Sequence, residues 1–567
     1  MSSPAYPEYD IIFAGGGTAA CLAASRLADA DSSLKILVLE QGLHTRNIDT
    51  HTQPGRYPSH LAPSSQTVTF NVANPSEELG GRCLITPSGR CVGGGSSVNF
   101  TMYTRAAASD YDEWETIHGN VGWGSQDLLP LLKKSETFQI RPNEPTHGYA
   151  GPLKVSWGGA YTNVGKQFLE VASQFDIERE SADDVNGLWI DGETGRRSDV
   201  PHCFIYNKTH KNLEIVDGKR VKRVVFENNR AVGIEYTNDT VSLPNGDQAL
   251  HTTRATRLVV LSAGAFGSPT ILERSGIGAK MVLEKNAVNV VVDLPGVGEN
   301  YQDHNVVFVP YLASNDAETL DALFRGDKEE VDKHVALWVE EGKGFLAHNA
   351  IDAGIKLRPT AEDLLELGPE FRDRWQTYFA DAPDKPVIWL GPVSAYLGDP
   401  SVASTRKYYS VGYHTQYPVS LGKVHIKSGE DHHIAPDFTS GFLKNPADVA
   451  TLRWGYKKSR EFARRMSVYR GEFTPGNPEF PEDAVARRMR RQSRLTTANL
   501  LGTCAMKGRE KGGVVDERLN VYGVEGLKVA DMSIAPGNVG ANTYSTALVI
   551  GEKAAVLIGE DLGIKVV

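Results

Sequence analysis

The chain has 567 residues, more than a single hydrophobic core usually serves, so we expect two or more domains. Its hydrophobic fraction of 40%, together with 56 glycines, brings the apolar total to about half, which is the balance of a folded globular protein and excludes a disordered or collagen-like chain. The formal net charge of −10 disfavours nucleic acid and anionic membrane surfaces as partners.

The strongest local pattern opens the chain. Residues 9–14 (YDIIFA) predict a buried strand, and residues 15–20 (GGGTAA) lead directly into a helical pattern at 21–27. In this G-x-G-x-x-A pattern the first glycine permits a tight turn, the second lets a pyrophosphate approach the backbone, and the alanine allows close packing of helix on strand. Phosphate then lies at the helix N-terminus. The expected dinucleotide-binding residues here are Gly15, Gly17, Thr18, Ala19 and Ala20.

A second predicted strand, residues 35–39 (KILVL), ends at Glu40. A carboxylate at this place can accept both ribose hydroxyls of an adenosine, and it disfavours the 2′-phosphate of NADP. The glycine pattern alone could be an ordinary tight turn. Strand, helix, second strand and terminal acid together predict a βαβ unit that binds a dinucleotide.

Two further glycine-rich segments follow. Residues 89–99 (GRCVGGGSSVN) can bring consecutive backbone N–H groups against a ligand, although a surface linker is the alternative. Residues 264–269 (GAFGSP) come directly after the predicted strand 258–261. Within the first segment the expected ligand contacts are Gly94, Ser96 and Asn99.

Both segments resemble the two signature sequences of the glucose–methanol–choline (GMC) oxidoreductases, a family of flavoproteins that bind FAD. Residues 294–304 (LPGVGENYQDH) and 523–533 (GVEGLKVADMS) resemble two further landmarks of that family. The likeness spans nearly the whole chain in the family order. It implies FAD as cofactor, with Asp531, Asn542 and Thr543 as additional cofactor-binding residues.

Within the family, three segments look most like fungal and yeast alcohol (methanol) oxidases: residues 102–105 (MYTR), 110–114 (DYDEW) and 538–544 (NVGANTY). This chain lacks their insertion before the C-terminal motif and their extended tail. Large assemblies and peroxisomal import, which those segments provide, are therefore not expected here.

The resemblance implies an α/β fold in which a Rossmann-type FAD-binding domain is interleaved with an α+β substrate domain that carries an antiparallel sheet. The FAD-binding domain is expected at 1–157, 213–310 and 495–567, and the substrate-binding domain at 158–212 and 311–494. In the substrate domain, alternating patterns predict strands at 406–416 and 422–427, and an amphipathic pattern predicts a helix at 449–466.

The expected catalytic base is missing. Oxidation of an alcohol by FAD transfers hydride to flavin N5 while a base takes the hydroxyl proton. In the family this base is the histidine of H-x-x-G-T, and a second His or Asn follows near the C-terminus. Here the motif reads NLLGT at 499–503 and the second position is Asn542, so the pair is Asn499 and Asn542. A carboxamide can orient a substrate but has no useful pKa near neutrality.

Three functions are compatible with this pair. The first is oxidation of the CH–OH group of a small or secondary-metabolite alcohol, with the proton leaving to another group. The second keeps FAD but carries out a cyclisation, dehydration, isomerisation or lyase reaction. The third is a catalytically silent flavin-binding protein.

His348 is the leading candidate to replace the base, because it lies where related oxidases place a segment near the flavin. A solvent-facing or core histidine without a catalytic role is the alternative. His414 is a weaker candidate, and His304 is expected to be structural. No metal is proposed, because the histidines and cysteines lack ligand spacing.

The basic cluster at 487–491 (RRMRR) predicts a solvated helix face or an anionic substrate contact rather than a nucleic-acid site. No signal peptide precedes the first strand, no apolar run approaches the roughly 18 residues of a membrane span, and the last residues are not an SKL tripeptide. We expect a cytoplasmic protein that acts on a small molecule. The oligomeric state is not indicated.

Overall fold

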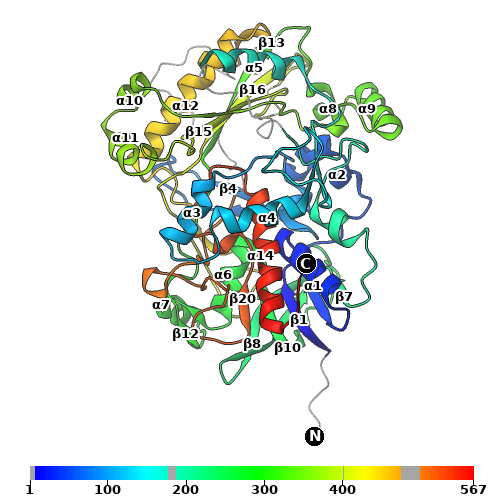
Figure 1. Cartoon of the computed structure of the whole chain (residues 1–567), viewed down its shortest axis with the longest axis vertical. Coiled ribbons are helices and arrows are strands. Elements are labelled where there is room, and N and C mark those ends of the chain that lie inside the picture. The colour runs from blue at the N-terminus through cyan, green and yellow to red at the C-terminus, as the bar shows by residue number, and fades with distance from the viewer. Residues whose placement is uncertain (1–6, 176–186, 400, 402, 474–498, 567) are drawn as a thin grey trace.

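The computed structural model describes residues 7–175, 187–399, 401, 403–473 and 499–566. The basic cluster at 487–491 lies outside these ranges. Two sheets organise the described part, one in the lower and one in the upper half of Figure 1.

The lower sheet has seven strands in the order β7-β2-β1-β10-β9-β8, with β20 pairing with β10. Around β1 the pairing is parallel, as a βαβ unit requires, whereas β8 and β9 form an antiparallel edge. The strands are β1 Glu8–Ala14, β2 Ile36–Leu39, β7 Leu213–Val216, β8 Lys219–Glu227, β9 Arg230–Asn238, β10 His251–Leu261 and β20 Leu527–Val529. The predicted first strand, helix and second strand are thereby confirmed.

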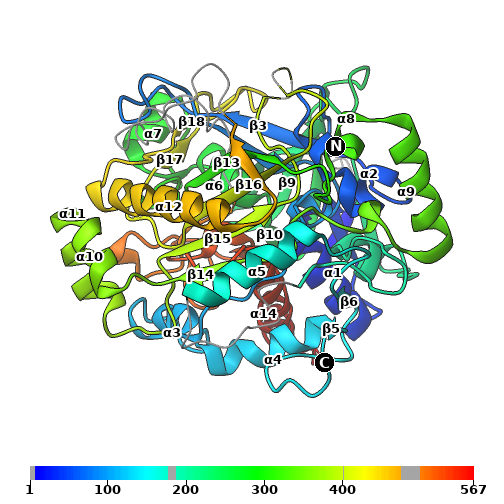
Figure 2. The same cartoon turned by 90° about the horizontal axis from the view of Figure 1, so that it is seen from above.

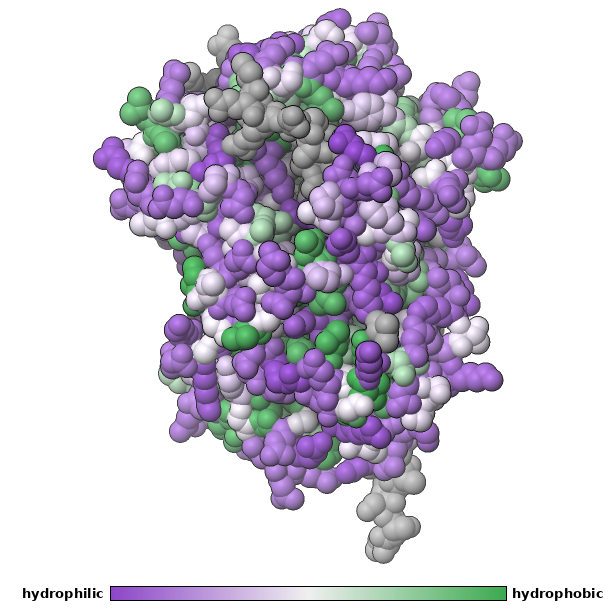
Figure 3. Space-filling view, viewed as in Figure 1, coloured by the Kyte–Doolittle hydropathy of each residue, from purple (hydrophilic) through white to green (hydrophobic). Residues whose placement is uncertain are grey.

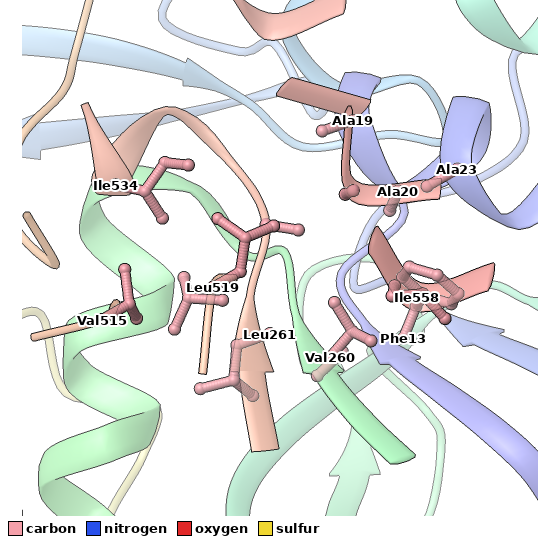
Figure 4. Close-up of a cluster of buried hydrophobic side chains, with 14 of the residues drawn as sticks. Phe13, Ala19, Ala20, Ala23, Val260, Leu261, Val515, Leu519, Ile534 and Ile558 are labelled. Atoms are coloured by element: carbon pink, nitrogen blue, oxygen red, sulfur yellow. The ribbon is translucent and has the colours of Figure 1, made fainter. Parts of the chain in front are cut away.

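Helices α1 (Thr18–Ala30) and α14 (Tyr544–Leu562) pack together beside this sheet. Gly551 of α14 allows the close approach, since a Cβ there would lie 3.0 Å from the Ala19 Cα. Figure 4 shows the resulting core, in which Phe13 of β1 and Val260 of β10 lie beside Ile558 of α14. Burial of this apolar surface stabilises the layer.

The upper sheet has five antiparallel strands in the order β14-β15-β16-β13-β19. They are β13 Val306–Ala313, β14 Ile355–Leu357, β15 Ile388–Val393, β16 Tyr408–Thr415 and β19 Tyr469–Glu472. Seen from above in Figure 2, helices α5 (Asn163–Phe175) and α12 (Pro446–Arg465) lie across β15 and β16. A second hydrophobic core fills this layer.

Helix α12 begins three residues before the predicted start at 449. The Asn445 side chain accepts a hydrogen bond from the Ala447 N–H, and Pro446 occupies the first turn, so this end carries a cap and a preset backbone. The predicted strands at 406–416 and 422–427 correspond to β16 and to β17 (Lys423–His425).

The remaining elements surround these layers. The helices are α2 Asp49–Thr52, α3 Ala108–Thr116, α4 Ser125–Ser135, α6 Gly264–Arg274, α7 Lys280–Lys285, α8 Asp321–Arg325, α9 Lys328–Glu341, α10 Ala361–Leu367 and α11 Pro369–Arg374. The short strand pairs are β3 Val68–Val72 with β4 Ile85–Gly89, β5 Glu136–Phe138 with β6 Leu153–Val155, β11 Ile277–Gly278 with β12 Val292–Asp293, and β17 with β18 Asp437–Thr439.

Strand β13 crosses the predicted domain boundary at 310 and belongs as a whole to the upper sheet. The exact domain limits stay a prediction. On the face drawn in Figure 3, polar residues dominate and apolar residues form only small, separate groups. None of the helices in the described ranges combines the length and apolar character needed to cross a membrane.

Candidate active site

The first glycine turn joins β1 to α1 at the carboxyl end of the lower sheet. Gly15 has φ +107°, and a Cβ there would lie 2.4 Å from the Ser262 carbonyl oxygen, so only glycine fits between the ends of β1 and β10. Gly17 is the N-cap of α1. The first N–H groups of the helix therefore face outward for an anion, as the motif predicts.

Glu40 lies directly after β2 and is buried. Its two carboxylate oxygens accept hydrogen bonds from the Gly16 and Gly42 N–H groups, each at 2.8 Å. Burial raises the pKa of the Glu40 carboxyl to about 7, although these two hydrogen bonds oppose the shift. The side chain is held against the glycine turn and titrates near neutrality.

The second glycine segment lies against the first. Gly94 has φ +52°, and a Cβ on it would lie 3.0 Å from the Gly17 Cα. The Asn99 Oδ1 accepts a hydrogen bond from Nη1 of the buried Arg197 at 2.8 Å. Thr18 Oγ1 donates to the Gly93 carbonyl oxygen at 3.2 Å, which ties the two loops together.

Asp531 connects the third glycine segment to the C-terminal motif. Its carboxylate accepts hydrogen bonds from the Gly264 N–H at 2.8 Å, the Ser268 hydroxyl at 2.6 Å and the Ser533 N–H at 2.7 Å. These bonds hold the N-terminus of α6 beside the segment that follows β20.

One cavity of about 1520 Å³ joins these features. Drug-sized ligands occupy roughly 300–1,000 Å³, so this space accommodates a large cofactor together with a second small molecule. The predicted site residues that line it are Gly15, Gly17, Thr18, Ala19, Glu40, Gly94, Ser96, Asn99, Asn499, Asp531, Asn542 and Thr543.

Ala20 and His348 do not line the cavity. Ala20 belongs to the hydrophobic core (Figure 4), where its small side chain allows the close packing that the motif predicts. The His348 ring is fully buried, its Nε2 lies 3.1 Å from the Asp352 carboxylate, and its Nδ1 accepts from the Ala350 N–H at 3.0 Å. The structure does not bring His348 to Asn499 and Asn542.

Asn499 is fixed by its hydrogen bonds. Its Oδ1 accepts from the Thr543 N–H at 3.1 Å and from the Thr543 hydroxyl at 3.0 Å, and its Nδ2 donates to His304 Nδ1 at 3.0 Å. Asn499 lines the cavity, and because its Oδ1 already accepts two hydrogen bonds, its second N–H is the hydrogen-bonding group that has no partner within the described ranges.

Asn542 precedes α14. Its Oδ1 accepts from the Thr104 hydroxyl at 3.2 Å, and its backbone N–H donates to the same hydroxyl oxygen at 2.9 Å. The Nδ2 group is left as the free hydrogen-bonding end of this amide in the part of the chain that the structure describes. The two amides therefore both offer N–H donors, a combination suited to a substrate oxygen that gains negative charge.

A stack of rings leads from Asn499 to the upper sheet. His304 donates from Nε2 to the Val539 carbonyl oxygen at 3.1 Å, so its Nδ1 is the acceptor for Asn499. Its ring stacks on His414 with centroids 4.9 Å apart, and His414 stacks on Trp389 at 5.4 Å. Both His414 and Trp389 line the cavity, and His304 does not.

Burial lowers the pKa of His304 to about 4. Burial also lowers the pKa of His414 well below its usual value, and the neighbouring His304 adds to this shift. Both rings are therefore neutral near pH 7. The His414 Nδ1 lies 3.4 Å from the Thr415 carbonyl oxygen and 3.4 Å from the Gln416 side-chain amide nitrogen, and its Nε2 has no hydrogen-bond partner among the described residues.

Comparison with known proteins identifies the family. The GMC oxidoreductase models match residues 9–306 with their N-terminal part and 418–551 with their C-terminal part. The chain belongs to the GMC oxidoreductase family.

This GMC oxidoreductase is 39% identical to an alcohol oxidase of Candida boidinii, over 98% of this chain and 95% of the relative. It is 30% identical to an oxygen-dependent choline dehydrogenase of Pectobacterium atrosepticum, over 97% and 94% of the two chains. A solved structure of an FAD-dependent oxidoreductase from Chaetomium thermophilum has the same fold, with a TM-score of 0.83, 24% identity and coverage of 98% and 100%.

The protein is thus a flavoenzyme whose cofactor is FAD, as the sequence predicts. The described residues fit this cofactor: two glycine turns with no room for a Cβ at Gly15 and little at Gly94, the N-terminus of α1, a buried acid at the end of β2 and a cavity larger than a single substrate needs.

Two site residues were missed in the sequence. Thr104 holds Asn542 and lies in the MYTR segment that carries the family likeness, so its place in the motif was an available signal. Trp389 comes from a strand without any local motif, and only the pairing of β15 with β16 brings it beside His414.

Proposed function

We propose that this GMC oxidoreductase oxidises the CH–OH group of an alcohol to a carbonyl compound. The observation that carries the proposal is that two amides, Asn499 and Asn542, and one imidazole, His414, line the same cavity as the FAD-binding turns. The alcohol oxidase and choline dehydrogenase relatives support the same reaction class. FAD, when bound, supplies the acceptor for the two electrons and the hydrogen of the substrate C–H bond.

In this proposal the two amides hold the substrate oxygen. Asn499 and Asn542 each donate an N–H, and these donors stabilise the oxygen as its proton departs and the C=O bond forms. In this proposal Asn499 stands at the position of the family's histidine and orients the substrate, but it does not accept the proton. The bonds from Thr543 to Asn499 and from Thr104 to Asn542 fix the two amides before the substrate arrives.

The proton requires a separate acceptor, and His414 is the candidate that the geometry favours over His348. Its imidazole lines the cavity and stacks on His304, the ring that accepts a hydrogen bond from Asn499. Burial and His304 lower the pKa of His414, which keeps the ring neutral and also makes it a weaker base than a free imidazole. A neutral imidazole has one lone pair for the hydroxyl hydrogen of the alcohol. His348 is instead committed to Asp352, whose carboxylate is also bound by Thr162.

A second candidate function keeps FAD but performs no net oxidation. The observation that favours it is the Asn499–Asn542 pair itself, since two neutral donors would hold a carbonyl or hydroxyl group through a cyclisation, dehydration, isomerisation or lyase reaction. A silent flavin protein is the third possibility.

An anaerobic single-turnover experiment separates these functions. The purified holoenzyme is mixed with a series of alcohols, and the flavin absorbance and the product mass are followed together. We expect loss of the oxidised flavin absorbance with one carbonyl product formed per flavin. Product without a flavin change would establish the second function, and neither change with any substrate would leave the silent one.

Restoration of the family residue sharpens the test. Asn499→His places an imidazole at the usual position of the base, so we expect faster flavin reduction by simple alcohols. His251→Gln serves as the control, because this half-buried histidine of β10 does not line the cavity. If Asn499→His produces flavin reduction with a substrate that the parent converts without any, the oxidative proposal for the parent fails.

A further inference from the structure

An apolar pocket forms the wall of the cavity next to His414. It belongs to a hydrophobic cluster separate from the cores of the two sheets. The cluster members that the argument uses, all of which line the cavity, are Phe100, Phe308, Phe324, Ile351, Trp389 and Val393.

Aromatic rings make up most of this group, and they come from separate parts of the chain. Phe308 lies on β13, Phe324 on α8 and Trp389 on β15, whereas Phe100 follows Asn99 at the end of the second glycine segment. The pocket therefore extends from the cofactor-binding loop to the upper sheet. Tyr57 packs against two of these rings: its ring centroid lies 4.2 Å from that of Phe100 and 5.9 Å from that of Phe324.

Glycines hold two of these rings in place. A Cβ on Gly391 would lie 2.5 Å from the Trp389 ring, and one on Gly354 would also lie 2.5 Å from it. On the neighbouring strand β16, a Cβ on Gly412 would lie 2.7 Å from the Phe308 ring. The backbone thus leaves room for both rings, and a side chain at any of the three glycines would displace one of them.

The reacting groups lie at one end of this wall. Trp389 stacks on His414, so the aromatic surface continues directly into the imidazole that faces the cavity. A substrate whose hydroxyl meets His414 and the two amides has its remaining atoms next to the aromatic rings. Methanol has no such atoms and would leave the wall unused, whereas each additional buried CH₂ strengthens binding by roughly fourfold.

We propose that the substrate is an alcohol whose carbinol carbon carries an aromatic ring, and that the pocket of Phe308, Phe324 and Trp389 binds this ring. The inference rests on the proposed function and specifies its substrate class. Its step is the oxidation of Ar–CH₂OH to Ar–CHO: the C–H hydrogen leaves with two electrons to the FAD, and the O–H proton goes to the His414 imidazole. Aromatic walls favour an aromatic ligand over an aliphatic one of the same size through edge-to-face and offset stacking.

The test compares benzyl alcohol, cyclohexylmethanol and methanol with the holoenzyme. The apparent Kd of each is taken from the concentration dependence of anaerobic flavin reduction. We expect benzyl alcohol to bind at least about 10²-fold more tightly than methanol and about 2- to 10-fold more tightly than cyclohexylmethanol. Methanol binding as tightly as benzyl alcohol overturns the inference, and cyclohexylmethanol binding as tightly as benzyl alcohol overturns its aromatic part.

Phe324→Ala should weaken benzyl alcohol binding by roughly tenfold or more, and by a larger factor than it weakens methanol binding. Phe175→Ala is the matched control, because it truncates a partly buried phenylalanine of α5 that does not line the cavity. An equal loss in both variants contradicts the pocket.

A non-reacting probe keeps this test independent of the proposed function. Toluene, which has the ring but no hydroxyl, should perturb the flavin absorbance of the holoenzyme, and Phe324→Ala should abolish that change. If no alcohol reduces the flavin yet toluene binds in this way, the proposed oxidation fails and the aromatic pocket stands. If toluene does not bind, the pocket fails whatever the outcome with alcohols.

Discussion

The two ends of the cavity are built from different parts of the polypeptide. At the cofactor end, the contacts come from the backbone of glycine turns, with Gly15 wedged against Ser262 and Gly94 against Gly17. At the reacting end, the contacts come from side chains. A hydrogen bond joins Asn499 to His304, and ring stacking joins His304 to His414 and His414 to Trp389. Substitutions at the first end should therefore act on cofactor binding, and substitutions at the second on turnover.

The largest effect is expected from Gly15→Ala. The residue has φ +107°, and the added methyl group would meet the backbone at Ser262, which cannot move without shifting β10. Overpacking and the left-handed backbone together should cost about 2–5 kcal/mol. We expect a protein without bound FAD, measured as flavin released on denaturation per polypeptide.

Gly119→Ala controls for the backbone conformation in that experiment. Gly119 has φ +78°, but an added Cβ would have no atom within 4 Å. The variant should keep its FAD and lose only about 1–2 kcal/mol of stability. Full FAD content in Gly15→Ala would show that the turn does not constrain the cofactor end in the way described.

At the reacting end, His414→Ala should lower the rate of flavin reduction by roughly 10² to 10⁴, the usual worth of a general base, with FAD content unchanged. The comparison is His348→Ala. Removal of His348 takes away the imidazole that lies 3.1 Å from the buried Asp352 carboxylate, a change that costs about 1–3 kcal/mol of stability. Its rate at a temperature where it is folded should equal that of the parent.

A large loss of rate in His348→Ala, with no loss in His414→Ala, would show that His348 and not His414 is the base. Stopped-flow reduction at several pH values measures both variants, and a thermal unfolding curve of each separates loss of stability from loss of rate.

The difference between backbone contacts at the cofactor end and side-chain contacts at the reacting end also explains which site residues the sequence could predict. The turn at Gly15, the acid Glu40 and the loop at Gly94 follow from local patterns, because backbone contacts require particular small residues at fixed spacing. The family likeness adds Asn499 and Asn542. The role of His348 was inferred from its position in the chain. That position does not reveal that the His348 Nε2 lies 3.1 Å from the carboxylate of Asp352, four residues later.

His414 shows the converse. In the sequence it is one histidine in a strand of alternating pattern, and its access to the cavity depends on the pairing of β16 with β13 and β15. Register between strands distant in sequence decides which face carries the imidazole, and a single sequence does not specify it.

A smaller effect is expected from Asn542→Ala. The substitution removes one of the two N–H donors at the reacting end, and loss of a donor of this kind typically lowers the rate by roughly 10² to 10³. Asn163→Ala, which removes the amide of a partly exposed residue of α5, is the control. A rate loss of that size in Asn542→Ala with unchanged FAD content would place Asn542 at the reacting end. Loss of FAD instead would assign it to the cofactor end.

The smallest effect concerns Glu40 and the pH dependence of cofactor affinity. Its pKa in the folded protein is raised from the usual 4.5 to about 7 by burial, so the free site holds a proton below pH 7. A ribose that donates two hydroxyl hydrogens prefers the carboxylate, and binding must then release that proton. FAD affinity should therefore rise with pH up to about 7, by at most roughly tenfold per unit, and level off above it. The stability of the FAD-free protein should change with pH in the opposite direction. Because burial raises the pKa of Glu40 in the folded state, the free energy of unfolding falls as the pH rises from the unfolded pKa through about 7.

The control is Glu40→Gln, whose side chain cannot titrate. Its affinity for FAD, measured by fluorescence titration of the apoprotein, should not change over the same pH range. The same slope in Glu40→Gln would mean that another group carries the proton.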